Sequence, residues 1–534
     1  MKKSGLRILP SVPYRSHFAE AVGHVTLQNM ESDPKTQPDS LTKEATAIAG
    51  GSAIVMVGGI GERAVRMLTT WFLSGALGAS GFGLYAFATT VASIVGALAP
   101  LGMDAGLIMY GARYRASDET SRLKGTLFIA LGTVAISGPL FAVATWLAVE
   151  NGLVLQGRPA EAKAITAISA AIAYMAVLAV LVGALVSRKD MVGQAWAQQI
   201  TVPVVTLVGA GVAILTGQGT RGVITAFVLA HLIAVIIASK RFWSADGDLI
   251  KNANIEPVTE PRALFSYALP QSFARVLYRA NLWVDILMLT ALSSLVDVGI
   301  YRVSVALAML GALPVMASTT MFGPVIAELV YTEQISKLNA LLKIVTRWLL
   351  VIAAPLYFVV LLLPDIVLSI FDPAYQSGAH ALLILMAGQA IYVAAAPTGA
   401  ILTNAGHSTL NLINGLIAVT LNIGLNAWLI PDLGILGAAI ASATALSIWS
   451  VLRMVQVWRL HRCSPVSMKS AVLLGLVLVI GTGTKIMLTG FGAWSRVGGV
   501  SLIVATGLVL FWRFGRTAED DAIIDRFKAR FGRR

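Results

Sequence analysis

The chain has 534 residues, of which 57% are hydrophobic and only 13% are charged, and its formal net charge is +13 at pH 7. Soluble globular proteins carry about 25% charged residues, so this composition excludes an ordinary soluble enzyme or binding module. The single cysteine, Cys463, excludes both an intrachain disulfide and a metal centre built from a cluster of cysteines.

The N-terminal segment, residues 1–44, is polar, and we predict that it forms a disordered cytoplasmic tail. It contains no apolar run of the kind that makes a secretory signal. The polar sequence after Met30 reads as a short N-terminus in its own right, so Met30 is a second candidate start.

Apolar runs of about 20 residues, the length of a helix that crosses the hydrocarbon core, recur along the rest of the chain. The alternation typical of barrel strands is missing, so we predict an all-α polytopic membrane protein. We place 14 transmembrane helices on the sequence, at Ala45–Ser74, Gly83–Leu107, Gly125–Val149, Ala164–Val186, Trp196–Leu215, Gly222–Ser239, Leu264–Leu292, Val298–Leu329, Leu338–Leu363, Ala381–Thr403, Leu410–Ile430, Ile435–Val457, Ala471–Leu488 and Val497–Trp512.

The basic residues indicate the topology of these helices. With the N-terminus inside, the inner loops and tails hold about 30 of the 40 Lys and Arg residues, and the outer loops hold about 5. This asymmetry predicts that both termini lie in the cytoplasm. It also accounts for the net charge without nucleic acid, so we expect anionic membrane lipids rather than nucleic acid as partners.

Two landmarks of the first half of the chain recur in the second half, at offsets that agree within one residue. They pair Arg63-Ala64 with Arg279-Ala280, Phe82–Tyr85 with Val298–Tyr301, Gly219 with Gly434, and Gly222 with Gly437. The offset contains six predicted helices, an even number, so both copies have the same orientation. We therefore predict parallel repeats related by an axis along the membrane normal.

The repeat sets the predicted domain organisation. Two six-helix lobes, residues 45–239 and 264–460, surround a central cavity, and a cytoplasmic linker, residues 240–263, joins them. Residues 461–512 add two extra C-terminal helices, and residues 513–534 form a basic cytoplasmic tail.

The seventh predicted helix carries the most specific chemical signal. Its polar side chains follow one another at steps of three and four residues and so share one helix face, with Arg279 adjacent; they are Gln271, Arg275, Tyr278, Asn281 and Asp285. A charged stripe is untenable against lipid. We therefore expect this face to meet protein or water.

The first predicted helix supplies a matching group. Glu62 and Arg66 are four residues apart and can pair on one face, which leaves Arg63 freer. Because Arg63 and Arg279 are equivalent in the repeat, the two lobes present them to a shared cavity. The planar donor fork of arginine suits bidentate phosphate contacts, so we predict that Arg63, Arg66, Arg275 and Arg279 bind an anionic substrate.

The polar residues of these helices leave alternatives open. Four arginines face only two carboxylates, and this excess favours anion binding over interlobe salt bridges. Asp285 and Glu62 are candidates for coupling to a proton or sodium ion, whereas the alternative makes Asp285 a counter-ion for Arg275 or Arg279. Asn422 and Asn426 either bind sugar hydroxyls or form hydrogen bonds between helices.

Features that the sequence lacks argue against catalysis. There is no GxxxxGK[ST] phosphate loop, so we do not expect ATP hydrolysis. The predicted outer loops are too short for a catalytic domain. We predict that the chain is not an enzyme and uses no cofactor or metal.

Several segments resemble bacterial polysaccharide flippases of the multidrug/oligosaccharidyl-lipid/polysaccharide exporter superfamily. The resemblance covers roughly residues 45–460 and is carried by Leu77-Gly78, Gly83-Leu84-Tyr85, Leu101-Gly102-Met103-Asp104, Ala112-Arg113-Tyr114, Leu421-Asn422-Ile423, Asn426, Leu429-Ile430-Pro431, Gly434 and Gly437-Ala438-Ala439. It implies two six-helix lobes in a V around a cationic cavity.

The resemblance also implies a function. A flippase of this kind moves an undecaprenyl-pyrophosphate-linked oligosaccharide, a repeat unit of O-antigen, capsule or exopolysaccharide, from the cytoplasmic to the periplasmic leaflet by alternating access. It implies a monomer in the bacterial inner membrane, with a polysaccharide polymerase and a chain-length regulator as candidate partners. A lipid II flippase is the nearest alternative; the excess of arginine argues against a multidrug exporter, and an enzyme of polysaccharide assembly is a more distant alternative.

Overall fold

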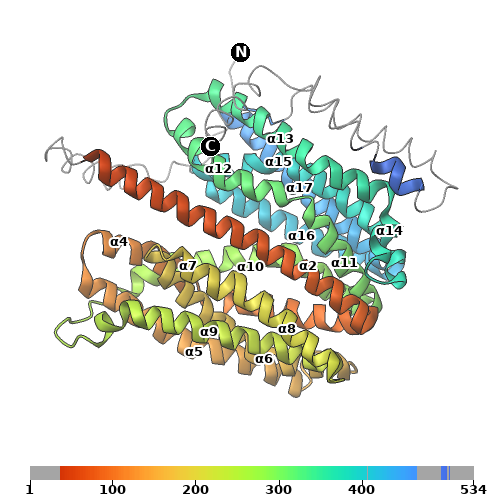
Figure 1. Cartoon of the computed structure of the whole chain (residues 1–534), viewed down its shortest axis with the longest axis horizontal. Helices are drawn as coiled ribbons and strands as arrows, with labels where there is room; N and C mark the ends of the chain where they lie inside the picture. Colours follow the sequence, from red (N-terminus) through yellow and green to blue (C-terminus); the bar gives the residue numbers. More distant parts are fainter. Residues whose placement is uncertain (1–36, 406, 466–494, 502–503, 505–534) are drawn as a thin grey trace, which may run out of the picture. The chain divides into compact units, whose positions relative to one another are not determined.

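The computed structural model describes residues 37–405, 407–465, 495–501 and 504 (Figure 1). Within these ranges the side chains of residues 37–56 and of a few later residues, Tyr278 among them, are not described. The chain divides into two units, Met1–Ala53 and Ile54–Arg534, and of the first unit only the helical residues 37–53 are described. The predicted helix Ala471–Leu488, most of the predicted helix Val497–Trp512 and both ends of the chain lie outside the described residues.

The described residues form helices joined by short connections, without a strand. Nine of the described helical segments are long and apolar enough to cross a membrane, which confirms the predicted all-α polytopic fold. The count of 14 separate spans is not confirmed in the described part, because the first two predicted spans form one helical segment and none of the nine segments covers the predicted spans at 264–292 and 298–329.

The first two predicted helices are joined in α2 (Gln37–Leu98). The helix is interrupted only at Gly78, whose φ of 65° and ψ of 175° are strained for any residue with a side chain. This glycine therefore makes the turn that the sequence predicts between the two spans. The helix begins at Gln37, so the last eight residues of the predicted disordered tail are helical.

The helices that follow form a first set, in which α6 packs on α5 and α9, and α8 packs on α9 (Figure 1). Their bounds are α3 Met103–Gly106, α4 Ala112–Ala116, α5 Thr120–Glu150, α6 Pro159–Ser187, α7 Met191–Gln194, α8 Val202–Leu215 and α9 Gly219–Lys251, with π-helical turns at Leu107–Gly111 and Ala195–Thr201.

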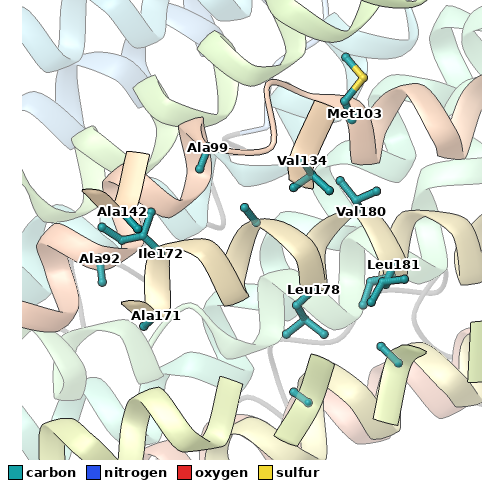
Figure 2. Close-up of a cluster of buried hydrophobic side chains, with 14 of the residues drawn as sticks. Ala92, Ala99, Met103, Val134, Ala142, Ala171, Ile172, Leu178, Val180 and Leu181 are labelled. Carbon is teal, nitrogen blue, oxygen red and sulfur yellow. The ribbon is translucent and has the colours of Figure 1, made fainter. Parts of the chain in front are cut away.

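Small side chains let the helices of this set approach closely. Figure 2 shows part of their core, where Ala92 of α2, Ala142 of α5 and Ala171 of α6 lie among larger side chains such as Ile172 and Leu178. Helices in a membrane gain stability mainly from such close packing, because lipid tails are as apolar as the side chains themselves.

A second set of helices completes the described fold, with α15 and α16 packed on α17 and α10 packed on α16. Their bounds are α10 Pro261–Leu292, α11 Leu295–Leu310, α12 Leu313–Tyr331, α13 Ile335–Leu362, α14 Pro364–Ser369, α15 Ala379–Asn404, α16 Ser408–Leu433 and α17 Ile435–His461. The predicted helix Val298–Leu329 is thus two helices. The break falls at Gly311 and Ala312, just before Pro314, which lacks the N–H that would continue α11.

The predicted linker 240–263 is largely helical, which corrects our expectation. Only residues 252–260 lie between α9 and α10. Asp246, 2% exposed, accepts hydrogen bonds from Arg115 at 2.9 Å and Arg188 at 3.0 Å, so the charges that suggested a loop are paired inside the fold. We call the end of the helices at residues 252–260 the linker end, and the opposite end the far end.

We expect Asp246→Ala to destabilise the protein by about 3–5 kcal/mol, because it leaves the guanidinium groups of Arg115 and Arg188 without their buried partner. Thermal unfolding in detergent measures this loss. The control is Asp248→Ala, which removes an exposed carboxylate from the same helix. Equal unfolding temperatures for the two variants would contradict the expected role of Asp246.

Backbone geometry supports the predicted repeat. Gly219 at the start of α9 and Gly434 just before α17, which are equivalent in the repeat, have φ angles of 55° and 53°. A glycine with a positive φ therefore precedes or opens the last helix of each copy.

Contacts at the far end follow the same repeat. A Cβ on Gly83 would overlap the carbonyl oxygen of Leu295, and a Cβ on Gly299 would overlap the carbonyl oxygen of Ala79. At the offset that relates Arg63 to Arg279, Ala79 corresponds to Leu295 and Gly83 to Gly299. Each of the two contacts is thus the other with the roles of the two repeats exchanged, as at a two-fold axis.

A second pair of far-end contacts obeys this symmetry. Arg158, in the connection between α5 and α6, donates to the carbonyl oxygen of Thr290 at the end of α10. The hydroxyl of Tyr375 donates at 3.4 Å to the carbonyl oxygen of Ser74, which is the repeat equivalent of Thr290. Both sides of the pseudo-two-fold axis are therefore joined at the far end.

Apolar packing reinforces this connection. One hydrophobic cluster contains Leu73 and Phe82 of α2, Ala213 of α8 and Val223 of α9 together with Tyr301 of α11. At the linker end, by contrast, Ile326, Leu342, Ile401 and Val457 of the second set belong to a cluster of their own. Among the described side chains, the two sets thus share this core toward the far end, and nearer the linker end Leu264 and Ala268 of α10 also belong to a hydrophobic cluster of the first set.

We expect Gly83→Ala to loosen the far end, because the added methyl group must displace the Leu295 carbonyl. Overpacking of this kind costs about 1–3 kcal/mol, and roughly 1.4 kcal/mol changes a conformational equilibrium tenfold. The reporter is Ala86→Cys in a Cys463→Ser background, because Ala86 is only 1% exposed. Its rate of labelling by a water-soluble maleimide should rise about tenfold in the Gly83→Ala variant. Gly132→Ala, which meets no atom within 4 Å, is the control; an unchanged labelling rate in Gly83→Ala would oppose this expectation.

Candidate functional site

The predicted polar stripe of α10 does not act as one surface. Gln271 is exposed, Asn281 is half-buried, and Asp285 is 2% exposed. Arg275 and Arg279 are both half-buried. The stripe divides between two neighbours, because Arg275 bonds to α3 and Asp285 bonds to α16.

Arg275 forms an ion pair with Asp104, a residue that the sequence analysis did not assign to the site. Asp104 lies in α3, shortly after Gly102, which has a φ of 77° and approaches the Ala268 carbonyl too closely for any side chain. This glycine lets α3 reach α10. The pairing also corrects one of our alternatives, because the counter-ion of Arg275 is Asp104 and not Asp285.

In α2 the predicted pair is present: Arg66 donates to Glu62 at 2.9 Å. The side chain of Arg66 remains 52% exposed and that of Glu62 24% exposed, so the pair is open to a further ligand. Arg63 is half-buried, one residue beyond Glu62. No hydrogen bond or ion pair joins Arg63 to another residue in the part of the chain that the structure describes.

Arg302, in the predicted helix Val298–Leu329, is a further cation to which the sequence analysis gave no role. It stands over the indole ring of Trp283, with the guanidinium carbon 4.0 Å from the ring centroid. Arg66 and Arg302 are close enough for their charges to repel, and both act electrostatically on Tyr85. Within the described residues no carboxylate forms an ion pair with Arg302.

Asp285 belongs to a buried polar cluster. Its carboxylate accepts from the Tyr301 hydroxyl at 2.9 Å and from the Asn426 amide at 2.7 Å, and Asn426 also donates to Asn422 at 2.8 Å. Asn426 thus forms a hydrogen bond between α16 and α10, the second of our alternatives, whereas its bond to Asn422 lies within α16. The side-chain oxygen of Asn426 is buried without a donor among the described residues, so the cluster has one spare oxygen ligand beside one negative charge.

Charged groups at the linker end are paired with one another. Arg241 donates to Asp190 at 2.8 and 3.2 Å, and these bonds hold the pKa of that carboxyl below its ordinary value. Lys124 donates to the carbonyl oxygens of Asn252 and Ile255, which ties residues 252–260 to α5. These contacts hold the connection between the two sets against the first set.

A family model described as "Polysaccharide biosynthesis protein" matches residues 48–330, more than half of the chain. The chain belongs to this family. No protein of curated function matches the sequence. The polysaccharide biosynthesis family is therefore the most specific assignment that sequence comparison gives.

Solved structures similar to this family member include a flippase and transporters. The lipid II flippase MurJ, in an inward closed conformation, is 12% identical, with 88% of this chain and 98% of that chain covered and a TM-score of 0.63. A multidrug resistance MATE family transporter in an inward-facing conformation is 15% identical, with 76% and 92% covered and a TM-score of 0.58. A MATE family transporter in an outward-facing conformation is also 15% identical, with 77% of this chain and 94% of that chain covered and a TM-score of 0.56.

At these identities the similarity concerns the fold. This member of the polysaccharide biosynthesis family therefore shares the helical fold of those proteins, and its described helices make it a multi-pass membrane protein. The described residues contain no group of three His, Cys, Asp or Glu side chains that could hold a metal ion.

Proposed function

We propose that this chain flips an undecaprenyl-pyrophosphate-linked oligosaccharide from the cytoplasmic to the periplasmic leaflet by alternating access. One observation carries the proposal. Arg302 of the second repeat stacks on Trp283 without a carboxylate in the described part of the chain, and the positive charge of Arg66, from the first repeat, acts on it. Glu62 offsets one of these two guanidinium charges, and the positive charge that remains at membrane depth favours an anionic ligand.

The chemistry of the two side chains suits a pyrophosphate. Each guanidinium offers a planar fork of N–H donors, and a pyrophosphate has phosphoryl oxygens on both phosphorus atoms. Trp283 fixes the plane of the Arg302 fork by stacking. A ligand with two negative charges removes the repulsion between Arg66 and Arg302, so binding stabilises the arrangement that brings the two repeats together.

Arg63, Arg275, Arg279, Gln271, Tyr278 and Asn281 remain proposed members of the same site. Arg63 lies one turn before Arg66 on α2, and the others line α10 between its linker end and Trp283. They would supply further phosphate and sugar contacts along the path. The glycan follows the headgroup, while the lipid tail stays in the bilayer.

We further propose that the Asp285 cluster couples transport to a proton or sodium gradient. Neutral donors from Tyr301 and Asn426 surround its carboxylate, so a bound cation or proton would neutralise the negative charge. Carboxylate and amide oxygens are the ligands that hard cations prefer. Glu62, paired with Arg66, is the second candidate for this role.

The proposed topology places the linker end in the cytoplasm of the bacterial inner membrane, because that end carries Lys124, Arg115, Arg188 and Arg241. The two C-terminal helices and the basic tail complete the proposed domain organisation of two six-helix lobes. The protein would act as a monomer and pass its substrate to a polysaccharide polymerase and chain-length regulator, without being an enzyme or needing a cofactor.

Translocation by the purified protein in proteoliposomes tests the proposal. The substrates are a fluorescent undecaprenyl-pyrophosphate oligosaccharide, lipid II and a fluorescent organic cation, each with and without an imposed sodium or proton gradient. Movement of the pyrophosphate oligosaccharide supports the proposal. Movement of lipid II alone would make the chain a lipid II flippase, and movement of the cation alone would reject an anion site.

A further inference from the structure

We propose that Asp104 is a positioning residue of the transport site, which holds Arg275 until the pyrophosphate of the substrate replaces it and then takes Arg275 back. The inference rests on the proposed function, because it names Arg275 as the first station for the lipid-linked pyrophosphate. It adds a residue, Asp104, and a reason for selection between anions. The ion pair between the two side chains is the juxtaposition that carries it.

The position of Arg275 along α10 makes it the first of two binding positions for the headgroup. It lies eight residues before Trp283, on which Arg302 stacks, so about 12 Å of helix separate the two levels. Arg275 is the one nearer the linker end. A headgroup that arrives from the linker end therefore meets Arg275 before it reaches Arg66 and Arg302.

The ion pair exists on one side of the pseudo-two-fold axis only. At the offset that relates Arg63 to Arg279, Asp104 corresponds to Thr320 and Arg275 corresponds to Gly59. A threonine and a glycine cannot form an ion pair. The far-end contacts are symmetric, whereas this bond between α3 and α10 is not, so it is not a by-product of the repeat.

The backbone of Asp104 is held by close packing, so its carboxylate has little freedom to follow Arg275. Gly183 of α6 packs directly against the backbone of Asp104, and Gly102 packs against Ala268 of α10. Asp104 is 13% exposed, and its second oxygen, Oδ1, is buried without a donor among the described residues. Arg275, 30% exposed, is the more accessible partner and the one that a ligand can draw away.

This arrangement selects for strongly charged headgroups. Withdrawing Arg275 leaves the carboxylate of Asp104 buried and unpaired, which is unfavourable. A phosphodiester lipid with a single negative charge competes poorly with the carboxylate for Arg275, whereas a pyrophosphate, with more charge and more oxygens, offsets the loss. When the headgroup moves on to Arg66 and Arg302, Asp104 recaptures Arg275 and prevents the headgroup from returning.

The kinetics of flipping by Asp104→Asn separate this role from a merely structural one. Without the competing charge, the pyrophosphate oligosaccharide should bind Arg275 more tightly and leave it more slowly. We expect the half-saturating substrate concentration and the maximum rate each to fall about tenfold, the effect of roughly 1.4 kcal/mol. Phosphatidylglycerol in the vesicles, at a level harmless to the parent, should inhibit the variant.

Two matched variants complete the kinetic test. Asp104→Glu keeps the charge and should stay close to the parent in both parameters. Asp190→Asn breaks a carboxylate–arginine pair at the linker end and should change neither. Unchanged parameters in Asp104→Asn, or a higher half-saturating concentration, would overturn the inference; no flipping by the parent would instead overturn the proposed function.

Cross-linking provides a second measurement that does not depend on the Asp104→Asn variant folding. A Cβ on Gly106 would lie 3.8 Å from the Cβ of Ala268, a spacing that suits a disulfide. In a Cys463→Ser background, the Gly106→Cys/Ala268→Cys variant should form this disulfide in membranes. The pyrophosphate oligosaccharide should leave the rate of its formation unchanged, because only the side chain of Arg275 moves and α3 stays against α10; a slower rate with substrate would show that the helices separate and would overturn the inference.

Discussion

Replacing Arg66 and Arg302 together with glutamine will lower the rate of flipping of the pyrophosphate oligosaccharide by at least about 100-fold. Each replacement removes hydrogen bonds from a charged group, worth about 1.5–3 kcal/mol, so the pair accounts for roughly 3–6 kcal/mol. The mutual repulsion of these two guanidinium groups from the two repeats is the basis of this expectation. The measurement is the initial flipping rate in proteoliposomes, normalised to the amount of inserted protein.

Two further variants define what this loss means. Arg302→Lys keeps the charge but loses the planar fork and its stacking on Trp283, so we expect an intermediate rate. Arg113→Gln removes an exposed arginine of α4 and should leave the rate unchanged. A double variant that flips at the parental rate would show that the phosphate binds elsewhere.

Asp285→Asn will make flipping independent of the ion gradient. The variant keeps the shape of the side chain and most of its hydrogen bonds to Tyr301 and Asn426, but it removes the charge that a cation would neutralise. We expect the rate under an imposed sodium or proton gradient to fall to the rate measured without a gradient. Binding of the pyrophosphate oligosaccharide should stay within about threefold of the parent, less than about 1 kcal/mol.

The control for this variant is Asp248→Asn, which neutralises an exposed carboxylate of α9 and should preserve the response to the gradient. Comparing sodium with proton gradients in the parent identifies the coupling ion. If Asp285→Asn still responds fully to the gradient, the buried cluster is structural and Glu62 becomes the remaining carboxylate for coupling.

The sequence predicts those features of the fold that depend on local spacing. Hydrophobic runs indicated the helices, the shared offset of the paired landmarks predicted the repeat, and a four-residue step predicted the pair of Glu62 and Arg66. The ends of the helices were harder to predict from the sequence. The charges around Asp246 suggested a loop, because the sequence does not reveal that Arg115 and Arg188 fold back onto them.

The partners within the candidate site were beyond prediction for a related reason. Periodicity shows which residues share a helix face, but it does not show which helix that face meets. Arg275 and Asp104 are 171 residues apart, and Asn426 and Asp285 are 141 residues apart. One signal was available: Arg302 stood in an apolar helix as an isolated charge, the same pattern that drew attention to the other arginines.

The contact of Gly83 with Leu295 and of Gly299 with Ala79 has a consequence for the history of the chain. Each half presents both a glycine notch and the carbonyl that fills it, so the surface of one half is complementary to a copy of itself. A polypeptide with only one half would therefore carry everything needed to pair as a symmetric homodimer. Joining two such copies in one chain freed each to change alone, and the carboxylate of Asp285 and the pair of Asp104 with Arg275 each stand in one copy only, opposite Thr69, Thr320 and Gly59.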